Sequence, residues 1–65
     1  MSSQLIKVHN RASDQIIDLL AELDKKGEVT KIYDYNGNEL KINFLCDEVY
    51  YKKTWWQFQK KQGAI

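Results

Sequence analysis

The single cysteine of this chain, Cys46, is the feature that most narrows what its 65 residues can fold into. One cysteine cannot form an internal disulfide, and with one histidine it cannot supply a four-ligand zinc site without carboxylates. A domain of this size buries only about 60% of the surface that its unfolded chain exposes. Small proteins therefore usually add cross-links, metals, oligomerisation or dense aromatic packing. We expect a single mini-domain over residues 1–65, without cofactor or metal, that depends on aromatic packing or on a partner.

Aromatic and basic residues gather at the C-terminal end of the chain. Five of the eight aromatic side chains lie between Tyr50 and Phe58, and residues 49–65 hold four lysines but no acid. Exposed rings beside cations suit stacking on nucleic-acid bases or docking on a protein, whereas buried rings would build the core. The net charge of +1 argues against a chain that binds polyanions over its whole surface.

Residues 12–26 have the apolar spacing of an amphipathic helix. The apolar residues that fall at i, i+3, i+4 and i+7 are Ile16, Leu19, Leu20 and Leu23. This spacing makes one apolar stripe along a helix, and Gly27 can end it. The sequence therefore predicts a helix over residues 12–26, preceded by a short strand at residues 4–8.

The dipeptide Asn36-Gly37 is the strongest turn signal, because it separates two runs rich in β-forming residues. A two-residue loop there pairs residues 29–35 with residues 39–45 in an antiparallel hairpin. This register gathers most of the apolar side chains on one face and leaves Ile32 in the middle of the polar face.

The remaining stretch fits two interpretations. Residues 48–53 have the composition of a third strand, and Thr54 begins a capping-box pattern that predicts a short helix over residues 55–62. The alternative is one helix that begins at Asp47. In both interpretations the fold class is α+β, a small antiparallel sheet with helices packed on one face.

Residues with catalytic chemistry are scarce. His9 is the only histidine, and Cys46 falls on the apolar side of the predicted hairpin, where a buried thiol is inert. A Cys46–His9 dyad would need the fold to bring the two side chains together. Chains of this length also rarely enclose the pocket of a few hundred Å³ that a small ligand needs. We expect no enzymatic activity.

Neither a membrane span nor a signal peptide is visible. No apolar run approaches the length of a transmembrane helix, and the apolar residues near the start are too few for a signal peptide. A lone cysteine suits a reducing compartment. These features predict a soluble, cytoplasmic protein with no membrane partner.

A small non-enzymatic binding protein fits these features best: a regulator or inhibitor that blocks a protein partner, and whose size suits a phage or mobile element. Adjacent tryptophans cannot both point into so small a core, so at least one is expected at the surface. The predicted partner-binding residues are aromatic or basic: Tyr51, Lys52, Lys53, Trp55, Trp56, Lys60 and Lys61. Two alternatives stay open, a nucleic-acid-binding protein that uses the same surface and a homodimer that buries the tryptophans.

Overall fold

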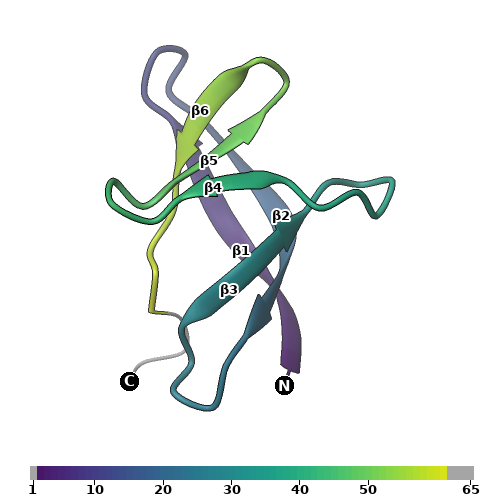
Figure 1. The fold of residues 1–65 in the computed structure, drawn as a ribbon. Coiled ribbons are helices and arrows are strands. Elements are labelled where there is room, and N and C mark those ends of the chain that lie inside the picture. Colours follow the sequence, from purple (N-terminus) through teal and green to yellow (C-terminus); the bar gives the residue numbers. More distant parts are fainter. Residues whose placement is uncertain (1, 62–65) are drawn as a thin grey trace.

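The computed structural model describes residues 2–61, which form an all-β fold. Six antiparallel strands curve into a nearly closed barrel (Figure 1). The strands are β1 (Ser2–Asn10), β2 (Gln15–Leu23), β3 (Val29–Tyr33), β4 (Lys41–Asn43), β5 (Glu48–Tyr51) and β6 (Thr54–Gln57). No helix occurs among the described residues, so the predicted α+β fold class is wrong.

Two three-stranded meanders make up the barrel. The strand order is β3-β2-β1-β6-β5-β4, so β1 and β6 meet where the two meanders join. This junction is narrow, because His9 and Gln57 are the one pair in register there within the described chain. At the opposite seam, between β3 and β4, an isolated bridge links Tyr33 and Glu39. The strands of the barrel are therefore well paired within each meander and weakly paired at both seams.

Ten apolar side chains fill the interior of the barrel. These buried residues are Ile6, Val8, Leu19, Ala21, Leu23, Val29, Ile32, Val49, Trp56 and Phe58. They come mainly from alternate positions of the strands, as a sheet with one buried face requires. Each fully buried Val, Leu, Ile or Phe contributes roughly 1.5–3 kcal/mol, so this cluster supplies most of the favourable free energy of folding.

The predicted helix over residues 12–26 is wrong, because most of this segment is the strand β2. Its inward side chains are Ile17, Leu19, Ala21 and Leu23, and its outward ones alternate with them. Leu19 and Leu23 belong to the predicted helical stripe as well as to this alternation, so the apolar pattern fits both periods. Pairing decides between them: β2 lies between β1 and β3 and pairs with both, whereas an isolated helix of about 15 residues is marginal in water.

The predicted helix over residues 55–62 is also wrong, and so is the alternative of one helix from Asp47. Thr54 begins β6 instead of capping a helix, and position 62 lies outside the described residues. β6 pairs with β5, which lies inside the predicted third strand at residues 48–53. The strand is the more stable conformation because it places Trp56 in the core opposite Val49.

The loop around Gly37 has three residues instead of the predicted two. The Asp34 amide donates to the Asn38 carbonyl at 3.0 Å, and the Gly37 amide donates to the Asp34 carbonyl at 3.1 Å. Gly37 has φ = 85°, and Asn36 is not among the described residues with positive φ. This is the three-residue loop whose last residue is left-handed, so Asn38 pairs with Asp34 instead of Tyr35.

A β-bulge at Thr30 explains why the predicted faces of residues 29–35 are wrong. Glu22 pairs with Lys31 and Leu23 with Val29, so Thr30 has no partner in the ladder. Its hydroxyl donates to the Glu22 carbonyl at 3.1 Å. The extra residue shifts the alternation by one position, which brings Ile32 into the core instead of leaving it on a polar face.

Leu19 and Leu20 give a matched test of the strand. Leu19 is fully buried and Leu20 is 43% exposed, whereas a helical stripe would bury both. In chemical denaturation, Leu19→Ala should lower the free energy of unfolding by about 2–5 kcal/mol and Leu20→Ala by about 1 kcal/mol or less. Equal losses at the two positions would contradict the alternation of β2.

We expect Asp34 to contribute to a loss of stability in acid. Its Oδ1 accepts the amides of Asn36 and Asn38, both at 2.9 Å. The Asn38 amide is the main cause that holds the pKa of Asp34 below its ordinary value in the folded state. A lowered folded pKa means that this contribution is present above the ordinary carboxyl range and lost as the pH falls through the lowered value.

Asp34→Asn keeps an acceptor oxygen but removes the titration. Between about pH 5 and about pH 3 the free energy of unfolding should fall less steeply in Asp34→Asn than in the wild-type protein. Urea titrations at several pH values measure both slopes. Parallel curves for the two proteins would show that Asp34 does not carry this dependence.

Candidate functional site

A pair of exposed aromatic rings lies on the outer side of the β5–β6 hairpin. Tyr50 and Trp55 sit directly opposite each other, with ring centroids 5.1 Å apart and planes tilted by 58°. Tyr50 remains 39% exposed and Trp55 38%. Lys41 pairs with Tyr50 from the other side, so these three residues form a row across β4, β5 and β6.

Two lysines extend this surface at the turn between β5 and β6. The register of Tyr51 with Thr54 leaves Lys52 and Lys53 as a two-residue loop. Both lysines are exposed and have positive φ, 52° and 62°. A two-residue loop of this kind favours Asn and Gly, because a left-handed conformation costs other residues about 1–2 kcal/mol each. Lys52 and Lys53 therefore occupy positions where Asn and Gly would make the folded protein more stable.

The surface formed by Lys41, Tyr50, Lys52, Lys53 and Trp55 is called the aromatic face below. The strands β4 and β6 contain no acidic residue, and β5 contains one, Glu48. Rings at its centre and ammonium groups at its edge give it an apolar middle with a positive rim.

Trp56 does not belong to the aromatic face, although the sequence placed it there. It is 4% exposed, and its indole Nε1 donates to the Tyr51 carbonyl at 3.0 Å. Tyr51 is half-buried between two other rings, with centroids 6.4 Å from Tyr35 and 6.3 Å from Trp56. Lys52 Nζ lies 5.5 Å from the centroid of the Tyr51 ring. Trp56 and Tyr51 are thus structural residues that support the exposed pair from beneath.

Lys60 and Lys61 lie away from the other predicted basic residues. The Lys60 carbonyl accepts the Val29 amide at 2.7 Å, and Lys61 forms an isolated bridge with Glu28. These contacts hold the two lysines beside the start of β3, at the opposite end of the barrel from the β5–β6 turn (Figure 1). The predicted site therefore divides into two basic pairs that cannot act on one small surface.

Tyr50 and Lys41 are not among the partner-binding residues predicted from the sequence. Strand alternation over residues 48–51 could have found Tyr50, because it places Val49 inward and Tyr50 outward. The position of Lys41 depends on the pairing of β4 with β5, which no local pattern shows.

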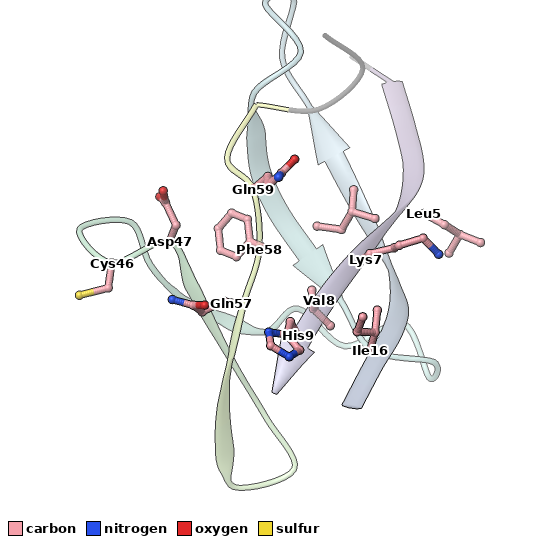
Figure 2. Close-up of a pocket in the computed structure, with 11 residues that line it drawn as sticks. Leu5, Lys7, Val8, His9, Ile16, Cys46, Asp47, Gln57, Phe58 and Gln59 are labelled. Atoms are coloured by element: carbon pink, nitrogen blue, oxygen red, sulfur yellow. The ribbon is translucent and has the colours of Figure 1, made fainter. Parts of the chain in front are cut away.

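A groove of about 700 Å³ opens between β1 and the segment that follows β6 (Figure 2). It forms because the two strands diverge beyond His9 and Gln57. Val8 and Phe58 contribute apolar lining. His9 and Cys46 lie on opposite sides of the groove in Figure 2, and the thiol points away from it. His9 Nε2 instead lies 2.8 Å from Asp14 Oδ1. His9 and Cys46 therefore do not form the nucleophilic dyad that the sequence left open.

In the part of the chain that the structure describes, no group of three or more His, Cys, Asp and Glu side chains is placed to hold a metal ion. Residues 2–61 also contain no helix with the length and apolarity needed to cross a membrane.

Comparison with known proteins gives no relative: no protein-family model, no curated protein and no solved structure matches the chain.

The Lys52–Lys53 turn predicts that a change on this face can stabilise the fold. Lys52→Asn with Lys53→Gly should raise the free energy of unfolding by about 1–2 kcal/mol, because both new residues tolerate positive φ. The lost contact between Lys52 and the Tyr51 ring offsets about 0.5 kcal/mol of this gain. The same exchanges at Lys60 and Lys61, which are not among the positive-φ residues, are the control and should not stabilise. Lower stability of the Lys52/Lys53 variant would contradict the strained turn.

Proposed function

We propose that this protein is a small, non-enzymatic binding protein that regulates or inhibits a partner protein by covering its surface with the aromatic face. The exposed Tyr50–Trp55 pair carries this proposal. Tyr and Trp are the side chains most enriched among residues that dominate binding free energies at protein interfaces. Both rings stay at the surface and in contact with each other, although burying them would have enlarged the core of so small a domain.

The contact between the two rings supports binding by a preorganised surface. Each ring restricts the other across the strand pair, so little side-chain freedom is lost when a partner covers them. Binding would remove from water the apolar area that each ring still exposes.

The lysines at the rim indicate the charge of the partner. Lys41 flanks Tyr50 on β4, and Lys52 and Lys53 form the turn next to the ring pair. Attraction from such charges at the edge of an interface mainly raises the rate of association. A partner with an acidic rim around an apolar patch fits this arrangement. The strained turn supports the same conclusion, because two lysines are present where Asn and Gly would be more stable.

A nucleic acid is the second candidate, and the same lysines beside exposed rings favour it. Two observations weigh against it. The ring planes are tilted by 58° and touch each other, so they do not present parallel faces to successive bases. Arg11 is the only arginine in the sequence, so no residue of the aromatic face can make the bidentate contacts that arginine gives to phosphates and bases.

Affinity capture from the lysate of the source organism, with matched variants, tests the proposal. Wild-type protein should retain a protein partner that Trp55→Ala and the Lys52→Asn/Lys53→Gly variant lose. The Lys60→Ala/Lys61→Ala variant, which removes the same charge at the other end of the barrel, should retain it. Circular dichroism confirms that each variant is folded. A partner that all the variants capture equally well would contradict the aromatic face as the binding surface.

Nuclease treatment and salt separate the two candidate functions. A protein partner held by tryptophan should survive nuclease and lose little affinity as salt rises. Binding to nucleic acid releases counterions, so affinity should fall steeply over the same range. Loss of every captured protein on nuclease treatment would replace the protein-binding proposal with the nucleic-acid one.

A further inference from the structure

The outer side of the β1–β2 hairpin carries apolar and charged residues in successive rows. The cross-strand rows are Leu5–Leu20, Lys7–Asp18 and His9–Ile16. The three aliphatic side chains are exposed: Leu5 at 61%, Ile16 at 62% and Leu20 at 43%. Single exposed aliphatic residues are ordinary, but here Leu5 and Leu20 lie side by side and Ile16 lies on the same side of the hairpin, beyond the charged row. These three rows are called the hairpin face below.

The charged row carries equal and opposite charges. Lys7 Nζ lies 3.4 Å from Asp18 Oδ1, and both side chains are largely exposed. An exposed pair of this kind contributes little to the stability of a single chain. It does give the hairpin face a positive side on β1 and a negative side on β2, so the face is complementary in charge to a second copy of itself.

We propose that the hairpin face is the interface of a two-fold homodimer, with its axis between β1 and β2 and parallel to them. This rotation exchanges the β1 side and the β2 side while keeping each row at its own height. Leu5 then meets Leu20 of the second copy, and Lys7 meets its Asp18. An isologous interface of this kind needs one surface that is complementary to itself.

The charges select this axis over the other face-to-face arrangement. An axis perpendicular to the strands, through the charged row, would place Lys7 opposite Lys7 and Asp18 opposite Asp18. The next row outward agrees, because Ser3 pairs with Glu22 and would meet Glu22 of the second copy. Within each chain, Glu22 Oε2 already accepts the Tyr33 hydroxyl at 2.7 Å, so its position is set before association.

The dimer is expected to be weak. The proposed contact involves only two strands of each copy, packed with the strands aligned. Part of the hairpin face also borders the groove beside β1, which Leu5, Lys7, His9 and Ile16 line. Stable dimers bury about 800 Å² on each partner, more than one hairpin offers. Association should therefore depend on concentration.

This dimer differs from one that buries the tryptophans, because Trp56 is in the core of its own chain and Trp55 lies on β6. It leaves the aromatic face free, so each dimer would carry two of them. The inference stands on the β1–β2 register and does not require the proposed function.

Sedimentation equilibrium of the purified protein tests the association. The mass should rise from 7.7 kDa toward twice that value as the concentration rises from about 10 μM to about 1 mM. Leu20→Lys should weaken association about tenfold or more, since it places a charge in the apolar row. Leu45→Lys is the matched control, because Leu45 is 97% exposed in a loop outside the hairpin face. A monomer at every concentration, or equal effects of the two variants, would overturn the proposal.

Complementary charge variants test the pairing itself. Lys7→Asp gives a copy with two acids in the charged row, and Asp18→Lys gives a copy with two lysines. Each variant alone should associate more weakly than the wild type, because like charges meet across the axis. A mixture of the two, one labelled with ¹⁵N, should form a heterodimer detectable by native mass spectrometry.

Repulsion within each copy is the same alone and in the mixture, so the gain on mixing reports contact between copies. The proposed axis would be overturned if no heterodimer formed, or if each variant alone associated as strongly as the wild-type protein.

Discussion

The strand β1 is the element on which the rest of the barrel depends. It pairs with β2 along nine residues and joins the second meander through His9 and Gln57. Its side chains Ile6 and Val8 are almost completely buried between the two halves. Without β1, each remaining half would expose its apolar side to water, and neither is large enough to form a core alone. The interior is thus shared between the meanders, and burial against β1 stabilises both.

Irregular backbone positions give the sheet its curvature and its outer surfaces. The bulge at Thr30 turns Ile32 inward, and the groove appears where β1 and β6 separate. Positive φ values fall in the turns, at two glycines and at Asp14, Asp47, Lys52 and Lys53. Two of the four non-glycine residues are the lysines beside Trp55. Two adjacent positive φ values therefore lie next to the exposed Tyr50–Trp55 pair, which connects the local backbone to the proposed binding surface.

The same alternation produces both the core and the two candidate interfaces. On β6 it sends Trp56 inward and Trp55 outward, and on β2 it sends Leu19 inward and Leu20 outward. The aromatic face lies on β4, β5 and β6, whereas the hairpin face lies on β1 and β2. Because the faces use different strands, one chain could use both at once. A dimer with two aromatic faces would bind a repeated partner with higher avidity than a single chain.

Local sequence patterns are enough to locate part of this fold. The strands β3, β4 and β5 fall within the ranges predicted for them, and the Gly37 turn is where the sequence predicts it, although its loop is one residue longer. Tertiary contacts are needed to show that residues 15–23 and 54–57 are strands and that Trp56, not Trp55, is buried. The spacing of Leu19 and Leu23 fits a helix as well as a strand. Thr54 can likewise cap a helix or begin a strand. Local preferences of a few tenths of a kcal/mol cannot separate such alternatives. Cross-strand pairing of β2 with β1 and β3, pairing of β6 with β5, and burial of Trp56 supply the larger free energy that does.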